Sequence, residues 1–497
     1  MAVSTMFSLQ DFLCPQLNVT TQTFIRISYG TLLFGTLLIA LPHARRFFIS
    51  EKWHGYAQSR ALTDMIQNPF VLPFVIALWF LCAVFIVLGQ WTILATFINL
   101  ILCRYFFVQM RWKGILRGMG APGFMTYWLA LAIFLLEYSL YYAFDMRHLV
   151  LLMLQVDFAL IIFSAGIYKF TAGYPQNQGM EFGLVNPEWG YWWKLYSKIS
   201  PKHWLFKSLN QLAWGTEVMA ALMMLIPPTR FLGAMLIILS FIFITTQIRL
   251  GLLCEMVMIC GALYFYPSSL GDQFIASLVA PISTSTMTSV TTVNSEIDMI
   301  LKLILWLYLF LLPFAHGGLF YNFYGKKSLP RPLQFILEVY TNFFGIIIWR
   351  VFSVDVVNFF INIYLQPRKG DRERTLISKW GWTGGFRYGH VGESITVTSI
   401  FTSLKYYPSN SILFTERLLR YAHTISCPDD SILIFEYVSI HKTDTKFEFV
   451  PVAEYIVDLS VEKVSEKTLN DVVSVRMGHT VSPIHEGTKP GSYTPLK

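Results

Sequence analysis

LVLLMLQVDFALIIFSAGIYKF, residues 149–170, is the stretch that decides the fold class of this chain. Its only charged side chains are Asp157 and Lys169, and about 20 apolar residues are enough for a helix to cross a bilayer. The polar sequence TAGYPQNQGMEFG follows at 171–183. We therefore predict a membrane-spanning helix over 149–170 that ends where the chain becomes polar.

Apolar stretches of similar length recur through the first 350 residues. The predicted spans are 23–41, 70–88, 92–108, 124–144, 149–170, 205–226, 231–248, 251–266 and 299–320. The pair 231–248 and 251–266 fits either two spans or one long bent helix. A tenth stretch, 334–352, carries Glu338 and Arg350 and fits either a span or a helix lying along the interface. We expect residues 1–352 to form an all-α polytopic membrane bundle of about nine helices.

The composition agrees with a membrane protein. Hydrophobic residues make up 54% of the 497 residues and charged residues 14%, whereas ordinary globular domains are about 25% charged. This excludes most soluble enzymes and low-complexity disorder. The net charge of +8 is explained by basic loops that face anionic lipid, so we expect membrane lipid and no nucleic acid as a partner. The six cysteines lack the spacing of zinc ligands, so no metal site is predicted.

Lys and Arg in short loops indicate the orientation, because such loops tend to stay in the cytoplasm. The loops 42–69, 109–123 and 321–333 are basic, whereas no Lys or Arg occurs between Leu250 and Leu301. With nine spans, the C-terminal domain is then cytoplasmic. If 334–352 also crosses, that domain lies outside.

The chain changes character at about residue 366. Alternating apolar residues predict strands at 393–404, 431–440 and 446–459, and helical spacing predicts a helix at 412–425. We expect a small extramembrane α+β domain over 366–477. The polar tail 478–497 is expected to be disordered.

Ionisable residues within the apolar stretches are the candidate functional residues, because burying them in a membrane is costly. Lys169 ends its span, where desolvation can make a lysine a base, although a snorkelling lysine gives the same pattern. Glu217 lies deep in 205–226 and needs a cationic or hydroxyl partner. Structural salt bridges are the other interpretation of these residues and of similar ones elsewhere in the apolar stretches, namely Arg26, Glu137, Asp157, Glu255 and Lys302. His316 stands beside Gly317 and Gly318, which indicates close helix packing.

The aromatic sequence NPEWGYWWK, residues 186–194, carries Trp189, Trp192 and Trp193. Asn186 as N-cap and Pro187 at the first helical position predict the start of a short helix. Tryptophan and lysine together are typical of the lipid headgroup layer. We expect an interfacial helix that binds lipid or gates a substrate.

Three segments carry a resemblance to a known family: SAGIYKF (164–170), QGMEFG (178–183) and LNQLAWGTEVMAALMMLIPPTRFLGAMLI (209–237). Over about residues 160–265 the chain resembles the membrane domain shared by vitamin K-dependent γ-carboxylases and bacterial HTTM proteins, which is distantly similar to DoxX. On this resemblance Lys169 and Glu217 match the family's Lys and acid, and Arg230 matches the Arg that follows. Because such carboxylases use a reduced quinone, the resemblance implies a quinone as cofactor.

Two classes of function follow from the sequence. In the first, the bundle holds a lipid or quinone, and the protein is a membrane redox or lipid-modifying enzyme in which Lys169 is the base, Glu217 assists, and Arg230, Trp189, Trp192 and Trp193 bind. In the second, the chain is a non-catalytic accessory subunit or maturation factor of a larger membrane complex, with other membrane proteins as partners.

Overall fold

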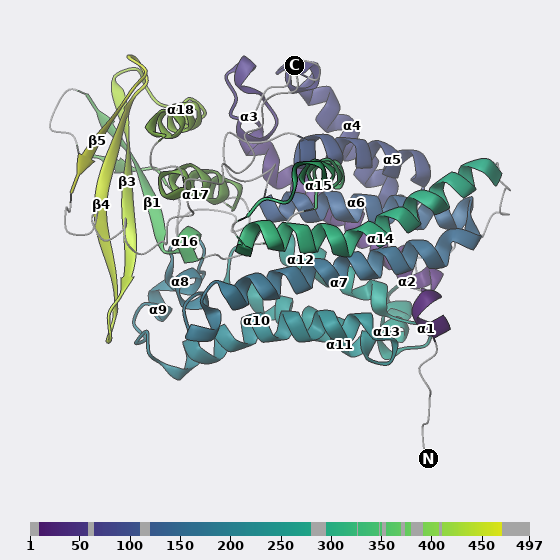
Figure 1. The fold of residues 1–497 in the computed structure, drawn as a ribbon. Helices are drawn as coiled ribbons and strands as arrows, with labels where there is room; N and C mark the ends of the chain where they lie inside the picture. Colours follow the sequence, from purple (N-terminus) through teal and green to yellow (C-terminus); the bar gives the residue numbers. More distant parts are fainter. Residues whose placement is uncertain are drawn as a thin grey trace.

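The computed structural model describes residues 9–57, 64–109, 120–279, 295–325, 327–346, 348–349, 354–368, 373–378, 391–406 and 410–469. A bundle of helices forms the larger part, and a small antiparallel sheet lies at one end of it, with two helices between sheet and bundle (Figure 1). This confirms a mostly helical chain with a small C-terminal α+β part. The predicted tail 478–497 lies outside the described residues.

The helices of the bundle follow one another along the first 344 residues. They are α1 (Leu9–Leu13), α2 (Val19–Ala40), α3 (Ala44–Phe47), α4 (Leu72–Leu88), α5 (Thr92–Cys103), α6 (Gly120–Tyr141), α7 (Arg147–Thr171), α8 (Met180–Val185), α9 (Trp193–Tyr196), α10 (Trp204–Leu225), α11 (Arg230–Gln247), α12 (Leu253–Gly261), α13 (Leu270–Val279), α14 (Ser295–Gly325) and α15 (Arg331–Phe344). Short 3-10 segments are η1 (Leu41–His43), η2 (Glu51–Trp53), η3 (Asp64–Gln67), η5 (Phe144–Met146), η6 (Tyr174–Gln176), η7 (Pro227–Thr229) and η8 (Ala262–Tyr264), and η4 (Arg104–Gln109) is π-helical.

Five helical stretches in the described part of the chain are long and apolar enough to cross a membrane. They are Val19–Phe47, Ala121–Tyr141, Phe144–Thr171, Pro227–Gln247 and Asp298–Gly325. The remaining predicted spans correspond to the shorter apolar helices Leu72–Leu88, Thr92–Val108 and Leu253–Tyr264, and to α10, which carries Lys207 and Glu217. The apolar stretches are therefore consistent with a polytopic membrane protein.

Neighbouring helices at the start of the chain run antiparallel. Arg26, early in α2, donates to the carbonyl of Ile86 at the end of α4. The indole N–H of Trp79 in α4 donates to Asn99 Oδ1 in α5 at 2.8 Å. Because these polar groups are buried among apolar side chains, each needs its partner, and the pairs fix how the helices are aligned.

Two glycines let α10 approach its neighbours closely. A Cβ on Gly166 of α7 would come within 2.7 Å of Val218 Cγ2, and a Cβ on Gly233 of α11 within 2.8 Å of the Ala220 carbonyl oxygen. Small residues allow such close approach of helices in membranes. The contact at Gly166 places the C-terminal part of α7 directly against the middle of α10.

The stretches 231–248 and 251–266 are separate helices. Gly251, with φ at +62°, lies in the turn between α11 and α12, and Thr245 donates to Glu255 Oε1 across it at 3.1 Å. Gly261 lies against Ile238, since a Cβ there would come within 2.8 Å of Ile238 Cγ1. The chain therefore turns back on itself instead of forming one bent helix.

The tenth stretch, 334–352, does not form a spanning helix. α15 ends at Phe344, where Gly345 adopts a φ of +75°. Its 14 residues measure about 21 Å, which is shorter than the roughly 30 Å of a bilayer core. α15 is amphipathic and exposes Leu333, Phe335, Ile336, Val339 and Phe343. α15 is therefore too short for a span, and its exposed apolar face is consistent with the other interpretation, a helix that lies along the interface.

The C-terminal part is built on a five-stranded sheet in the order β2-β1-β3-β4-β5, with all neighbours antiparallel. The strands are β1 (Phe359–Pro367), β2 (Thr375–Leu376), β3 (Ser431–Lys442), β4 (Phe447–Asp458) and β5 (Lys463–Thr468), and the helices are α16 (Val354–Val357), α17 (Val391–Tyr406) and α18 (Ser411–Ala422). The strands predicted at 431–440 and 446–459 and the helix predicted at 412–425 are confirmed. The sheet begins at Phe359, upstream of the expected boundary at 366.

The strand predicted at 393–404 is wrong, because this stretch belongs to helix α17. Its alternating hydroxyl residues do not face water. Thr396 donates to the Gly392 carbonyl at 2.8 Å, and Thr402 to the Thr398 carbonyl at 2.6 Å, so the helix backbone satisfies them. Buried Phe401 packs against four aromatic rings of α18 and the sheet. Because the helix backbone accepts these hydroxyl protons, the Thr side chains can be buried, so the alternating sequence is compatible with a buried helix.

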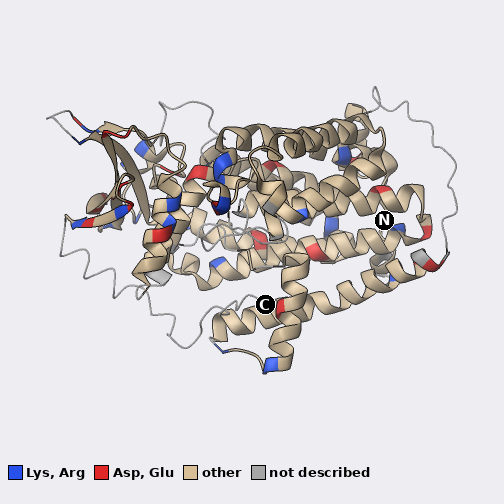
Figure 2. Ribbon diagram, turned by 90° about the horizontal axis from the view of Figure 1, so that it is seen from above, with Lys and Arg blue, Asp and Glu red and all other residues tan. Residues whose placement is uncertain are grey.

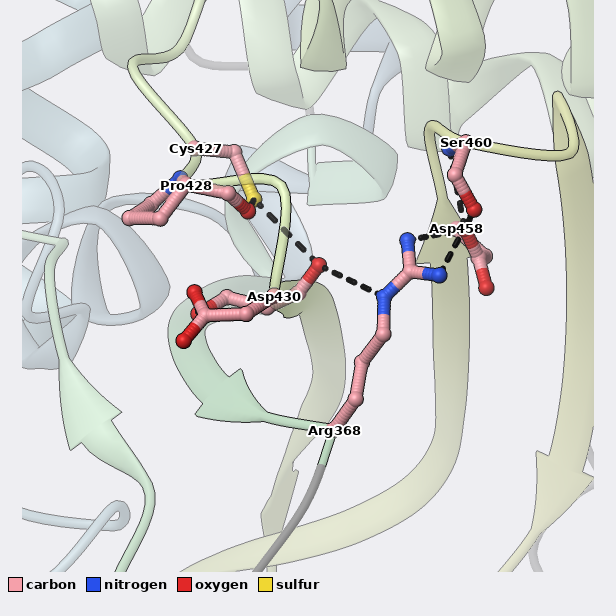
Figure 3. A network of polar contacts seen from close by, with 7 residues as sticks. Arg368, Cys427, Pro428, Asp430, Asp458 and Ser460 are labelled. Atoms are coloured by element: carbon pink, nitrogen blue, oxygen red, sulfur yellow. Dashed lines mark hydrogen bonds and ion pairs between the residues drawn. The ribbon is translucent and has the colours of Figure 1, made fainter.

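One arginine holds the edge of this sheet together. The guanidinium of Arg368, just after β1, donates to Asp458 Oδ1 at 2.6 Å and to Ser460 Oγ at 2.6 Å (Figure 3). The backbone N–H of Arg368 donates to the Asp430 carbonyl at 2.7 Å. Cys427 lies in the same corner, where burial raises the pKa of its thiol. The arginine therefore ties the end of β1 to the turn before β3 and to the turn after β4.

Candidate functional site

Lys169 and Glu217, the two candidates for chemistry, form a buried ion pair. Lys169 lies in the last turn of α7 and Glu217 in the middle of α10, and Nζ is 2.5 Å from Oε1. Only 6% and 4% of the two side chains are exposed. The close approach of the helices at Gly166 brings the two residues together, so each charge has its counterion inside the bundle.

A small cavity lies beside this pair. The space open to the centre of a water molecule is about 20 Å³, which is room for about one water. Apart from Lys169 and Glu217 its walls are apolar or aromatic: Ile162, Ala165, Met180, Ala213, Phe241, Ile244, Leu250 and Trp349. Ala213 of α10 and Ile244 of α11 are half-buried, so the cavity approaches the outer surface of the bundle between these helices.

Two polar atoms of the cavity-lining residues lack a hydrogen-bond partner among the described residues. They are Oε2 of Glu217, which accepts, and Nε1 of Trp349, which donates. Leaving a buried polar group unpaired costs about 1–3 kcal/mol. A molecule in the cavity that both donates and accepts a hydrogen bond would satisfy the carboxylate and the indole together.

The wall formed by α8 is tied to the C-terminal sheet. Met180 lines the cavity, and the adjacent Glu181 accepts from Asn210 Nδ2 of α10 at 2.8 Å. Lys442, at the end of β3, donates to Glu181 Oε1 at 2.9 Å and to the Asn177 carbonyl at 3.2 Å. The sheet thus holds the segment that closes one side of the cavity.

Arg230 lies at the other end of α10 from this cavity. It starts α11, donates to the carbonyl of Phe12 at 3.3 Å and lies over the Phe12 ring at 5.4 Å. Between Glu217 and the end of α10 at Leu225 the helix rises about 12 Å. The structure therefore joins Lys169 with Glu217 but gives Arg230 the role of holding α1.

The three tryptophans of 186–194 lie in different surroundings. Trp189 is buried, with 5% of its surface exposed, whereas Trp192 is 39% exposed and donates to the Thr246 carbonyl at 3.0 Å. Trp193 packs against Phe449 of β4, with ring centroids 6.1 Å apart. They do not form one headgroup-facing cluster, and only Trp192 is exposed enough to meet lipid.

The helix predicted to start at Asn186 is wrong, since this residue closes a turn. Its Oδ1 accepts from the Glu188 N–H at 2.8 Å, and its Nδ2 donates to the carbonyls of Val357 and Phe359 at 2.8 and 2.7 Å. The amide is therefore used to join the bundle to the first strand of the sheet. Only the four residues of α9 are helical in this stretch.

Glu188 is a residue that the sequence reasoning missed. It is buried at the junction, where Oε1 accepts from the Ile361 N–H at 2.8 Å and Oε2 from the Thr398 hydroxyl at 3.1 Å. Burial raises the pKa of Glu188 to about 8. The sequence shows an acidic side chain within the aromatic run NPEWGYWW, which could have marked Glu188 as a candidate. Its hydrogen-bond partners, however, come from the distant positions 361 and 398, which the local sequence does not reveal.

The chemistry of the site indicates what it could bind. A buried ion pair borders a small apolar cavity, and the lining residues include one acceptor and one donor without partners among the described residues. In the part of the chain that is described, no group of three His, Cys, Asp or Glu residues could hold a metal ion. No family model matches the chain, no curated protein is similar to it, and no solved structure matches its fold.

Proposed function

We propose that this chain is a multi-pass membrane protein of the HTTM or carboxylase-like type that holds the polar end of a lipid or quinone beside Lys169 and Glu217. One observation carries the proposal. The buried ion pair borders a cavity whose lining residues include an acceptor, Glu217 Oε2, and a donor, Trp349 Nε1, that lack partners among the described residues. A hydroxyl headgroup, such as that of a reduced quinone or of a lipid, can donate to the carboxylate and accept from the indole, while the surrounding apolar walls suit the rest of an amphiphile.

The ion pair offers a proton-transfer step. If a proton moves from Lys169 Nζ to Glu217 Oε1, the ammonium becomes a free amine and the carboxylate becomes a carboxylic acid. Nζ and Oε1 lie 2.5 Å apart and both side chains are buried, so the proton can pass directly between them. The amine can then take a proton from an acidic C–H or O–H of the bound molecule, which leaves as its anion. Lys169 is thus the base and Glu217 its proton store, in a lipid-modifying or redox reaction.

Access is proposed from the lipid side. The cavity has room for about one water, so a larger headgroup has to part the half-buried side chains of Ala213 and Ile244. The neighbouring residues Ile242 and Phe243 of α11 are exposed, as side chains that face acyl chains would be. An amphiphile could therefore enter between α10 and α11 without leaving the bilayer.

We also propose nine crossings, made by α2, α4, α5, α6, α7, α10, α11, α12 and α14. The antiparallel contacts between neighbouring helices support this alternation. The basic loop after α2 contacts the C-terminal part, since Arg46 lies 3.0 Å from Glu393. Because that loop is expected in the cytoplasm, the C-terminal domain is placed there too.

The test is extraction into a native-membrane polymer followed by mass spectrometry of bound lipophiles and proteins. We expect one class of quinone or lipid at constant stoichiometry in the wild type and its loss in Glu217→Gln. Glu137→Gln is the matched control, because Glu137 is a buried carboxylate paired with Arg26 elsewhere in the bundle. Wild-type protein that carries no such lipophile would overturn the proposal, and stoichiometric protein partners in its place would establish the accessory-subunit function.

A further inference from the structure

A second buried polar site lies between α6, α7 and α14. The carboxylate of Asp157 on α7 accepts two hydrogen bonds at Oδ2, from Trp128 Nε1 of α6 at 2.9 Å and from the Tyr308 hydroxyl of α14 at 2.9 Å. Asp157 is 4% exposed. No Lys or Arg lines the cavity beside it, so in the described structure this acid is held by neutral donors.

His316 of α14 lines the same cavity. Its Nδ1 lies 3.1 Å from the carbonyl of Leu312, and a carbonyl can only accept, so Nδ1 carries the proton. Nε2 has no partner among the described residues, and the side chain is 4% exposed. In the neutral ring this nitrogen is therefore a bare acceptor, buried next to a carboxylate.

The space between the two groups fits one water. The cavity open to a water centre is about 10 Å³, which is about the least that holds one water molecule. Its other walls are aromatic or aliphatic: Phe124, Tyr127, Trp128, Leu131, Ile161, Tyr308, Phe344 and Ile346. One water there can donate to both acceptors, but it leaves the buried carboxylate charge without a counterion, and a proton shared by the two groups removes that net charge.

We propose that Asp157 and His316 form a proton-binding site inside the bundle, holding one proton between them through one water. With one proton the site is neutral overall, as acid and imidazole or as carboxylate and imidazolium, and the two hydrogen bonds that Asp157 accepts favour the second form. With none it keeps a bare carboxylate, and with two it keeps a bare imidazolium, both unfavourable in apolar surroundings. When the proton moves, the Asp157 O–H bond breaks, the water passes a proton on, and an N–H bond forms at Nε2.

Among the described residues, the other titratable groups around this pair are phenols, and beyond them the guanidinium of Arg104 interacts with Tyr127. Tyr127 and Tyr308 line the cavity, Tyr340 of α15 donates to the Tyr308 carbonyl at 2.9 Å, and Tyr264 of η8 donates to the Gln155 carbonyl at 2.5 Å. Phenols ordinarily stay protonated well above neutral pH. The charge of the site near neutral pH is therefore set by Asp157 and His316.

The site is separate from the one at Lys169. Asp157 and Lys169 are 12 residues apart on α7, which is about 18 Å along the helix. Trp349 lines the first cavity and Phe124 the second, and their rings touch at a centroid distance of 6.3 Å. The proton site does not depend on what the Lys169 cavity binds, so the two proposals can fail independently.

The experiment is nitrogen NMR of the full chain, with its histidines labelled, in lipid nanodiscs between about pH 5 and about pH 8. The signals of His316 are those absent from His316→Gln. We expect them not to titrate near the ordinary histidine midpoint of about 6.5 in the wild type, and we expect Asp157→Asn to move Nε2 toward the position of an unprotonated nitrogen. Asp272→Asn is the control, since Asp272 is a buried acid bonded to Thr21, and it should leave the signals unchanged.

Two results would overturn the proposal. One is a wild-type His316 that titrates near pH 6.5, and the other is a folded Asp157→Asn protein whose His316 signals match the wild type. If Asp157→Asn does not fold, Tyr308→Phe removes one donor from Asp157. It should shift Nε2 in the same direction as Asp157→Asn, because a less stabilised carboxylate draws the shared proton away from His316. An unshifted Nε2 in that variant would also contradict a shared proton.

Discussion

Glu188→Gln tests the junction between the bundle and the C-terminal sheet. The carboxyl of Glu188 is buried between the Ile361 N–H and the Thr398 hydroxyl, and burial raises its pKa from 4.5 to about 8. When the junction opens, Glu188 meets water and its pKa returns to the ordinary value. At a pH between these two pKa values, the Glu188 carboxyl is protonated while the junction is closed and deprotonated once the junction is open. The closed junction therefore becomes less stable as the pH rises.

The size of the effect follows from the two pKa values. From about pH 6 to about pH 8 the free energy of opening should fall by about 2 kcal/mol, about a fiftyfold change in the opening equilibrium. Glutamine has nearly the same shape, can still accept from Ile361 and cannot ionise. In Glu188→Gln the pH dependence should therefore vanish.

Hydrogen–deuterium exchange of the peptide that covers β1 is the assay, because the Ile361 N–H is bonded to Glu188 itself. Comparing wild type with Glu188→Gln at each pH cancels the chemical dependence of exchange on pH. Glu448→Gln, at a partly exposed glutamate of β4, is the control and should behave like the wild type. A ratio of wild-type to Glu188→Gln protection that is the same at both pH values would refute the reasoning.

Three further predictions concern packing and ion pairs. Gly166→Ala places a Cβ 2.7 Å from Val218 Cγ2 and 2.9 Å from the Val218 backbone nitrogen. Thermal unfolding should therefore show a loss of about 1–3 kcal/mol in the free energy of unfolding. Gly215→Ala is the control, because a Cβ there would have nothing within 4 Å, and it should not be destabilised. Lys442→Ala frees Glu181 and should speed hydrogen exchange over 177–185, whereas Lys446→Ala, whose partner Glu448 is partly exposed, should not. The guanidinium of Arg374 lies 4.0 Å from the Glu436 carboxylate and 2.6 Å from the Glu454 carboxylate. Arg374→Ala removes this cation from between the two acids, so the sheet should unfold at a lower temperature above neutral pH. An unchanged unfolding midpoint would contradict this.

Properties that depend on apolar length and on charge inside a span could be predicted from the sequence. Lys169 and Glu217 could be expected to find partners because neither ion is tolerated alone in a membrane, and they pair with each other. Arg26 and Glu137, expected to take part in interhelical salt bridges, lie 3.9 Å apart. Asp157 instead takes hydrogen bonds from Trp128 and Tyr308, because neutral donors also satisfy a buried acid.

The features that could not be predicted depend on contacts between distant segments. Helix α17 has the alternating pattern of a strand, and its packing through Phe401 against α18 and the sheet involves residues distant in the sequence. His316 was expected to mark close packing, and Gly318 does admit Leu337, since a Cβ there would come within 2.9 Å of it. The imidazole itself lines a cavity, which the sequence near Gly317 and Gly318 does not reveal.

The unequal lengths of α4 and α14 bear on the kind of bilayer that surrounds the protein. α4 has 17 residues and exposes Phe74 and Leu81, so it matches a hydrocarbon thickness of about 25 Å, whereas α14 has 31 residues and reaches about 46 Å. If both helices cross the bilayer as proposed, lipid beside α4 must thin, and α14 must tilt to keep its apolar length out of water. Such hydrophobic mismatch would make the protein more stable in short-chain than in long-chain lipid, and would sort it toward the thinner membranes of a cell.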